Sequence, residues 1–103
     1  MLHNDPIAAL TPEVVAWRRH IHSNPELGFN EHETAHFVAE KLRAFGFDEV
    51  HEGIGGTGVV GVLRGGTGAR AIGLRAELDA LPVLEKTGLP YASRNAGVMH
   101  ACG

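Results

Sequence analysis

The chain has 103 residues, of which 44% are apolar and 20% are charged, a composition typical of one small globular domain rather than of a disordered segment. Its net charge is −3, which gives no electrostatic reason to expect a nucleic acid or an anionic membrane as a partner. No run approaches about 18 apolar residues, so a membrane-spanning helix is excluded, and residues 1–6 lack the regions of a signal peptide. A single cysteine cannot form an internal disulfide, which favours a reducing, cytoplasmic location.

Two amphipathic helices are predicted in the first half of the chain. Thr11 is suited to cap the first helix, Pro12 suits its first turn, and Asn24 followed by proline ends it. The second helix is expected to begin near Asn30, with Glu33 completing a capping-box pair. Gly46 is a natural left-handed terminator for that helix. The apolar stripe expected on it consists of Ala35, Val38, Leu42 and Phe45.

The helical spacing of apolar residues ends at Gly46, and short β-branched runs and glycines dominate after it. Residues 47–51, 59–63 and 69–76 are predicted to be strands, with residues 65–68 as a hairpin turn between the last two. The third run is apolar on both faces, as expected of a covered central strand. From Asp79 onward the turn signals indicate mostly loop.

Residues 32–36 match H-E-x-x-H, the zincin motif, in which two histidines one helical turn apart bind zinc and the glutamate is the base. On a helix, His32 and His36 would lie roughly opposite the apolar stripe, on the solvent face. The third histidine of the extended motif is absent, because Leu42 occupies its position. We therefore expect a solvated helix face, and a zincin-like protease using His32, Glu33 and His36 is the minor alternative.

Residues 53–58 match the glycine pattern G-x-G-x-x-G of dinucleotide-binding loops, and Glu77 follows at about the spacing of a ribose-binding acid. In those loops the third glycine opens a helix whose N-terminus meets the pyrophosphate. Here Gly58 is followed by a β-branched run typical of a strand. The pattern therefore predicts a glycine turn between two strands rather than a nucleotide site.

Acidic residues follow the apolar run 69–76. Glu77 and Asp79 come directly after it, and a proline then bends the chain. Carboxylates at the carboxyl edge of a sheet can bind a metal or orient a ligating histidine. The alternative is a solvated strand end at which Arg75 pairs with one of the acids.

Cys102 is the only cysteine and lies two residues after His100. A thiolate is a strong zinc ligand, but a catalytic metal needs at least three protein ligands. From these residues alone, Cys102 is either a free thiol or one ligand of a metal site that is only partly contained in the chain.

Short motifs follow one another in a fixed order along nearly the whole chain, at residues 17–29, 31, 33–35, 56–61, 74–82, 87–93 and 97–103. Together they resemble the amidohydrolase branch of the aminoacylase/carboxypeptidase-type metallopeptidases, which includes hippurate hydrolases and auxin-conjugate hydrolases. One departure is found at the strand end, where Glu77 and Leu78 replace the Asp and Met of the family motif R-A-D-M-D-A-L-P. This departure leaves the role of Glu77 open.

The resemblance implies a two-metal hydrolase, using Mn²⁺ or Zn²⁺, that cleaves the amide bond of N-acyl amino acids with a metal-activated water. It implies that Cys102 is a metal ligand and that Asp79 supports or orients the metal site. His22 also matches, but a packed histidine at a helix end explains it equally well. In the family, the other ligands, the general-base glutamate and a lid and dimerisation domain all come later in the sequence.

The expected fold is therefore α/β: the N-terminal part of a mixed-sheet α/β/α metallohydrolase catalytic domain, with two helices followed by short strands. We expect residues 1–103 to be a truncated amidohydrolase, inactive alone and unable to hold the metal pair. The complete parent would be a homo-oligomer acting on small N-acyl amino acids. A non-catalytic remnant or binding module is the alternative.

Overall fold

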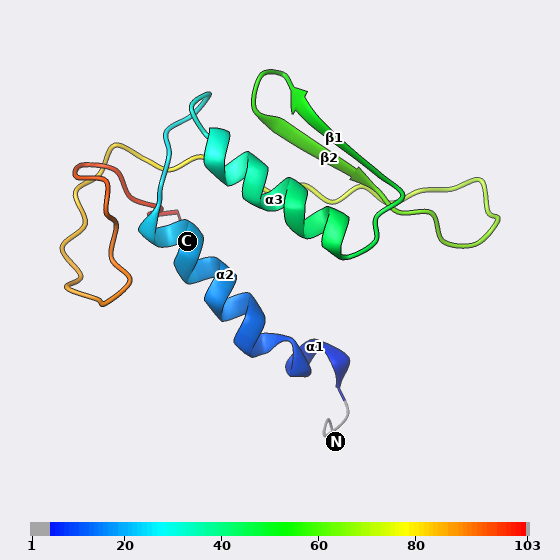
Figure 1. Ribbon diagram of the computed structural model, residues 1–103, viewed down its shortest axis with the longest axis horizontal. Helices are drawn as coiled ribbons and strands as arrows, with labels where there is room; N and C mark the ends of the chain where they lie inside the picture. The colour runs from blue at the N-terminus through cyan, green and yellow to red at the C-terminus, as the bar shows by residue number, and fades with distance from the viewer. Residues whose placement is uncertain (1–4, 103) are drawn as a thin grey trace.

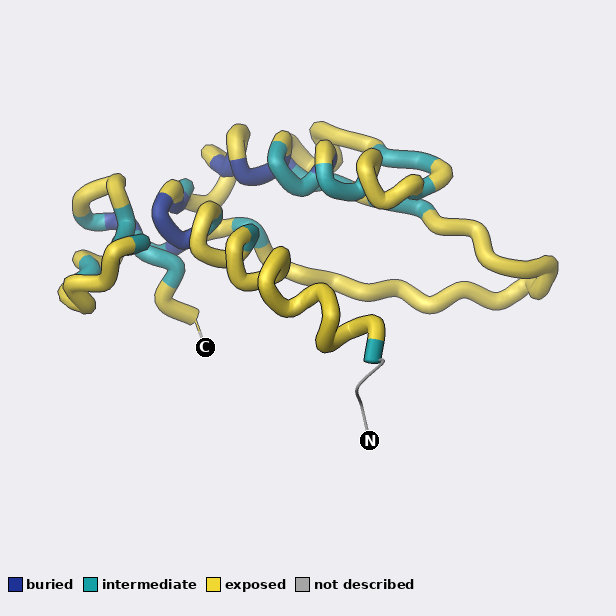
Figure 2. The backbone as a smooth tube through the Cα atoms, turned by 60° about the horizontal axis from the view of Figure 1, so that its bottom comes forward, coloured by how far each residue is buried: buried dark blue, intermediate teal, exposed yellow. Residues whose placement is uncertain are grey.

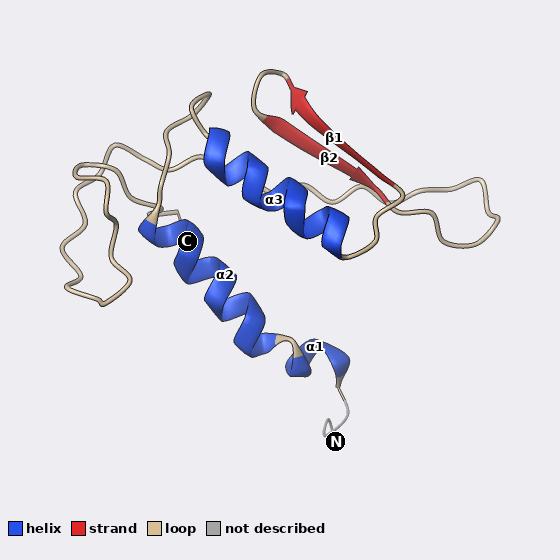
Figure 3. Ribbon diagram, in the orientation of Figure 1, coloured by secondary structure: helices blue, strands red, loops and turns tan. Residues whose placement is uncertain are grey.

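The computed structural model describes residues 5–102 (Figure 1). Residues 1–4 and Gly103 lie outside the described residues. Most of the segment to which the signal-peptide prediction applies, and the last residue of the motif 97–103, therefore lie outside them too. The described part contains three helices and one antiparallel hairpin (Figure 3). These elements are α1 (Pro6–Ala9), α2 (Thr11–Ser23), α3 (His32–Ala44), β1 (Glu49–Ile54) and β2 (Gly58–Val62).

The first predicted helix is confirmed as α2, and its end is closed by local hydrogen bonds. The Ser23 hydroxyl donates to the carbonyl of Arg19 at 2.9 Å, and the Asn24 side-chain amide donates to the carbonyl of His20 at 2.9 Å. Thr11 does not cap this helix, because the N-cap position is Leu10 and α1 directly precedes it. Asp5, whose carboxylate accepts from the amide of Ile7, caps α1.

The start of α3 is capped by a residue from the preceding loop and not by the expected capping box. Glu26 accepts from the backbone amide of Thr34 and from its hydroxyl, both at 2.6 Å, and from the amide of Glu33 at 3.2 Å. Burial alone would raise the pKa of the Glu26 carboxyl, but these hydrogen bonds, with a contribution from His32, hold it below its ordinary value of 4.5. The ionised carboxylate is therefore the form that the folded chain stabilises.

Replacing Glu26 with alanine should expose the first turn of α3 to exchange. Loss of this cap is expected to cost about 1–2 kcal/mol, so the amides of Glu33 and Thr34 should exchange about 5- to 30-fold faster. Because the folded pKa of Glu26 is lowered, its contribution is complete above pH 4.5 and lost as the pH falls through the folded value. Hydrogen exchange at pH 7 measures the effect, and Glu13→Ala, in the first turn of α2, should leave both amides unchanged.

Helix α3 covers one face of the hairpin. Ala35 and Ala39 are buried, and Gly61 of β2 lies so close that a Cβ there would sit 2.9 Å from the ring of Phe47 and 3.0 Å from Leu42. The prediction that Phe45 belongs to the buried apolar stripe of this helix is wrong. Phe45 is 54% exposed, and its ring lies 5.5 Å from that of Trp17 of α2. No helix of the described part covers the opposite face of the hairpin, and Val60 is exposed there.

The glycine pattern at residues 53–58 is a turn between strands, as predicted. β1 and β2 pair antiparallel from Glu49 with Val62 to Ile54 with Gly58, and the register shifts by one residue between His51 and Ile54. Gly53, Gly55 and Gly56 adopt φ angles of 72°, 64° and 107°, a region that favours glycine. No helix follows Gly58, so the dinucleotide interpretation is excluded by the backbone itself.

The expected third strand is not formed, and this is the main correction to the predicted fold. Residues 69–76 are extended but pair with none of the described residues, and residues 65–68 do not join two paired strands. Ile72 is 91% exposed and Leu74 95% exposed, so Figure 2 shows this stretch as a long uncovered segment. A strand needs a hydrogen-bonded neighbour, and the described residues provide none here. The sheet formed by the described residues therefore has two antiparallel strands.

The packing is open for a chain of this length. The radius of gyration is 15.9 Å, whereas a compact domain of about 100 residues has about 13 Å. No large side chain of the described part is fully buried, and the buried apolar residues are Ala35, Ala39, Ala80 and Val98. Among the described residues, no helix is both long enough and apolar enough to cross a membrane.

Candidate functional site

Three distant segments meet beside the end of α2. The amide of Ala80 donates to the carbonyl of Glu26 at 2.8 Å, which pairs Ala80 with Leu27 in a parallel bridge. Leu81 and Met99 exchange two backbone hydrogen bonds of 2.9 Å in an antiparallel bridge. The segment after Asp79 is thereby held between the loop that follows α2 and the segment that leads to Cys102. The sequence interpretation placed these residues in loops, and the bridges show how the loops are joined.

Asp79 is exposed and lies against Gly28. A Cβ at position 28 would be 4.0 Å from both the Cβ and a carboxylate oxygen of Asp79. The Nε2 atom of His100 is buried and has no hydrogen-bond partner within residues 5–102. Burial lowers the pKa of His100, the nearby His22 lowers it further, and Asp79 opposes both effects. The charges of His22 and Asp79 therefore both act on the imidazole of His100.

A buried hydrogen bond between His22 and Glu85 fixes the end of α2 to the C-terminal loops. The Nε2 atom of His22 lies 2.9 Å from Oε1 of Glu85, and the two side chains are 9% and 4% exposed. Oε1 of Glu85 also accepts from the amide of Ser93 at 2.8 Å, while its second oxygen accepts from the Thr87 hydroxyl. These bonds, chiefly those from Thr87 and Ser93, hold the pKa of Glu85 below its ordinary value. His22 therefore has the packed role that the sequence left open.

Further contacts complete this junction. The Ser93 hydroxyl donates to the carbonyl of Val98 at 2.6 Å, and the amide of Arg94 donates to the carbonyl of Ser23 at 2.9 Å. The ring of Tyr91 meets His22 edge-on at 5.9 Å, and the guanidinium of Arg19 lies over Tyr91 at 4.5 Å. The loops around the candidate site are therefore held by hydrogen bonds within the loop, by the backbone at the end of α2 and by the α2 side chains Arg19 and His22.

Glu77 lies outside this junction. It forms an ion pair with Arg75 at 3.2 Å, and the side chains of Arg75 and Glu77 are 84% and 62% exposed. This is the solvated pair of acid and arginine that was the alternative explanation of the acidic cluster. Exposed pairs of this kind add little to stability.

Cys102 is an exposed free thiol. Within residues 5–102, no three histidine, cysteine, aspartate or glutamate side chains are arranged to hold a metal ion. A catalytic metal needs at least three protein ligands, so the described residues do not fit a catalytic metal by themselves. Cys102 and Asp79 are consequently candidates for parts of a site and not for a whole one.

His32, Glu33 and His36 are all exposed on α3, and for His32 and His36 this is the solvent face predicted from helical geometry. A His32→Ala/His36→Ala double variant should therefore bind Zn²⁺ as the unchanged chain does. Isothermal titration of both proteins with Zn²⁺ measures this, and loss of a tight one-to-one site in the variant would make the zincin alternative the leading one.

The structural roles of three residues were not predicted from the sequence: Glu26 caps α3, and Glu85 bonds His22 and Ser93. The partners His22 and Glu85 are 63 positions apart, and no local pattern connects them. Glu26 lies just before a helix start, so a search for acids in the loop before α3 would have found its capping role.

No protein-family model matches the chain. The chain is 60% identical over 86 residues to a hippurate hydrolase of Campylobacter jejuni, an alignment that covers 84% of this chain and 22% of that enzyme. It is 47% identical over 91 residues to an N-acyl-L-amino acid amidohydrolase of Geobacillus stearothermophilus, covering 88% of this chain and 24% of that enzyme.

A solved structure is similar in fold as well. The YXEP protein of Bacillus subtilis, a dinuclear metal-binding peptidase of the M20 family, superposes with a TM-score of 0.85 at 37% identity, covering 93% of this chain and 27% of that one. The chain thus spans about a quarter of the length of the relatives it matches. Sequence and fold agree on the same relatives, and the chain belongs to the M20 amidohydrolase family.

Proposed function

We propose that the chain is the N-terminal segment of the catalytic domain of a metal-dependent amidohydrolase that hydrolyses N-acyl amino acids. The observation that carries the proposal is the 60% identity over 86 residues to a hippurate hydrolase. A second relative is named as an amidohydrolase of N-acyl-L-amino acids, which supports the same substrate class. The superposed peptidase is a dinuclear metal protein, which supports a pair of divalent metals, Mn²⁺ or Zn²⁺, in the complete enzyme.

In this proposal the described residues have separate roles. Cys102 provides one metal ligand from an exposed position, where a metal supplied with further ligands can reach its thiolate. Asp79 supports the metal site from the neighbouring segment, which the bridges Leu27–Ala80 and Leu81–Met99 hold in place. His22 and Glu85 position these loops and do not touch the substrate. The other ligands and the general base come from outside these residues, so no catalytic step is assigned to them here.

A chimera tests this proposal. The chain would replace the matching quarter of the Campylobacter hippurate hydrolase, and glycine release from hippurate would be measured with Mn²⁺ or Zn²⁺. We expect metal-dependent hydrolysis. Asp79→Asn should lower kcat/KM about 10- to 100-fold, as loss of a residue that supports a metal ligand does, and Cys102→Ser should lower it by more than about 100-fold.

The matched control is Ala101→Ser, which places the same side chain at the exposed neighbouring position and should leave hydrolysis unchanged. A folded, metal-loaded chimera that hydrolyses hippurate equally well with Cys102→Ser would contradict the assignment of Cys102 as a ligand.

A further inference from the structure

The turn between α2 and α3 holds Phe29 in a backbone conformation that is unusual for its residue type. Residues 27–30 form a β-turn, in which the amide of Asn30 donates to the carbonyl of Leu27 at 2.9 Å. Phe29 has a φ of 65°, and within residues 5–102 no other residue with a side chain has a positive φ. Where the third residue of a turn has a positive φ, glycine is preferred at that position. Here glycine is second and phenylalanine is third, so the turn is strained at Phe29.

Burial of the ring does not offset this strain. The side chain of Phe29 is 81% exposed. An exposed apolar side chain alone would be ordinary, because much of any protein surface is apolar. Exposure combined with a disfavoured backbone conformation is different, since strained residues persist mainly where the site that they belong to uses them. The two observations together indicate that the turn serves to present the ring of Phe29 outward.

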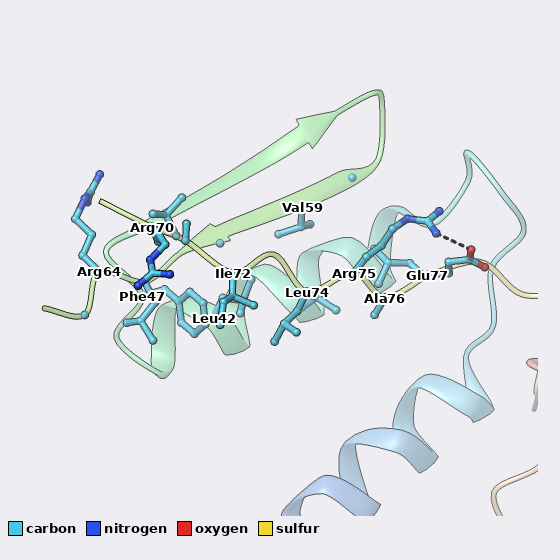
Figure 4. Close-up of a pocket in the computed structure, with 18 of the residues that line it drawn as sticks. Leu42, Phe47, Val59, Arg64, Arg70, Ile72, Leu74, Arg75, Ala76 and Glu77 are labelled. Carbon is cyan, nitrogen blue, oxygen red and sulfur yellow. Dashed lines mark ion pairs between the residues drawn. The ribbon is translucent and has the colours of Figure 1, made fainter. Parts of the chain in front are cut away.

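The same turn lies beside Asp79. A Cβ at Gly28, directly before Phe29, would be 4.0 Å from a carboxylate oxygen of Asp79. Glu31, two residues after Phe29, lines a cavity of about 1570 Å³ that Asp79 also lines. Figure 4 shows this cavity, with Glu77 next to the loop that joins α2 to α3. The residues on both sides of Phe29 therefore lie at the candidate site, and Phe29 is at its edge.

We infer that Phe29 contacts the acyl group of the substrate and makes the enzyme prefer aromatic acyl groups over small ones. This inference rests on the proposed function, in which Asp79 supports the metal site. Hippurate is benzoylglycine, so its ring is bonded directly to the carbonyl that is hydrolysed, and its glycine part has no side chain. An exposed aromatic side chain beside Asp79 matches that ring, since aromatic rings attract each other in stacked and edge-on arrangements.

The test uses the Campylobacter hippurate hydrolase chimera and two substrates that share glycine and differ in the acyl group, hippurate and N-acetylglycine. Phe29→Ala should lower kcat/KM for hippurate about 3- to 10-fold, as loss of one aromatic contact does, and leave that for N-acetylglycine unchanged. The change should be in KM and not in kcat, because the contact is made equally in the bound substrate and in the transition state. Phe29→Tyr keeps the ring and should keep the preference.

Phe29→Gly separates this role from a purely structural one. Glycine adopts a φ of 65° without strain, so this variant should unfold at the same temperature as the parent or at a higher one. It should nevertheless lose the preference for hippurate as Phe29→Ala does. The matched control is Phe45→Ala, which truncates another exposed phenylalanine (54% exposed) at the far end of α3 and should leave the preference unchanged.

Calorimetric binding of both compounds to the metal-free chimera gives a measurement that needs no hydrolysis. Phe29→Ala should weaken the binding of hippurate about 3- to 10-fold and not that of N-acetylglycine. Selective loss of hippurate binding in a chimera that hydrolyses neither compound supports the contact and counts against the proposed function. Hydrolysis with unchanged preference and unchanged binding does the reverse. Equal losses for both compounds, with a lower unfolding temperature in Phe29→Gly, would make Phe29 a packing residue and overturn the inference.

Discussion

The purified chain, incubated with hippurate and Mn²⁺ or Zn²⁺, should release no glycine above a blank that contains metal alone. The reason is stoichiometric. Within residues 5–102, no three side chains are placed to bind one metal ion. A catalytic metal must be held by at least three protein ligands before it can activate a bound water. Cys102 alone, an exposed free cysteine, can bind a metal only weakly and cannot position a substrate beside it.

The control for this experiment is the complete chimera under the same conditions, which shows that substrate, metal and assay are adequate. Turnover by the chain alone that disappears in Cys102→Ser would show that a functional site does assemble from these residues. In that case the stoichiometric argument would be wrong.

The isolated chain should also be marginally stable or self-associating. Ile72 and Leu74 are almost fully exposed, and each such side chain forfeits about 1.5–3 kcal/mol relative to burial. Ordinary domains are stable by only about 5–15 kcal/mol in total. The unpaired edges of β2 and of residues 69–76 would in addition invite strand pairing between copies. Light scattering and thermal unfolding of the purified chain measure both effects.

Ile72→Ser/Leu74→Ser should reduce the self-association, whereas Ile7→Ser, on α1 and away from these edges, should reduce it much less. A monodisperse monomer with a cooperative transition above about 60 °C, near the top of the range of mesophilic domains, would show instead that these residues form a self-sufficient fold.

The elements that local signals specify were predictable. α2 and α3 follow from apolar periodicity and from a proline or glycine at their ends, and the glycines of residues 53–58 identify the hairpin turn. Helix α1, a single turn capped by Asp5, could not be predicted, because four residues are too few to show an apolar periodicity. The cap of α3 was assigned to the wrong residues, because Glu26 reaches it from a loop seven and eight positions earlier.

The predicted strand at residues 69–76 failed for a different reason. Its apolar pattern is that of a covered central strand, but a strand exists only with a neighbour, and the neighbour is not among the described residues. The apolar pattern shows that residues 69–76 need a neighbouring strand and a cover on both faces, but it does not show that the described residues provide them. The same holds for Cys102, whose residue type suggests a ligand while its surroundings supply too few others.

The pair of His22 and Glu85 illustrates what single-sequence reasoning cannot reach. His22 was noticed because of its motif, but a packed role and a site role were equally supported. Only the spatial arrangement, with Glu85, Ser93 and Tyr91 around the imidazole, assigns it to the junction that holds the loops.

The account depends most directly on Cys102 being a metal ligand once the rest of the domain is present. Co²⁺ loaded into the hippurate hydrolase chimera in place of the native metal reports this, since a thiolate bound to Co²⁺ gives an intense sulfur-to-metal charge-transfer absorption. We predict that this absorption is present in the chimera and in Ala101→Ser, and absent from Cys102→Ser at equal metal loading. An identical spectrum in the chimera and in Cys102→Ser would contradict the account.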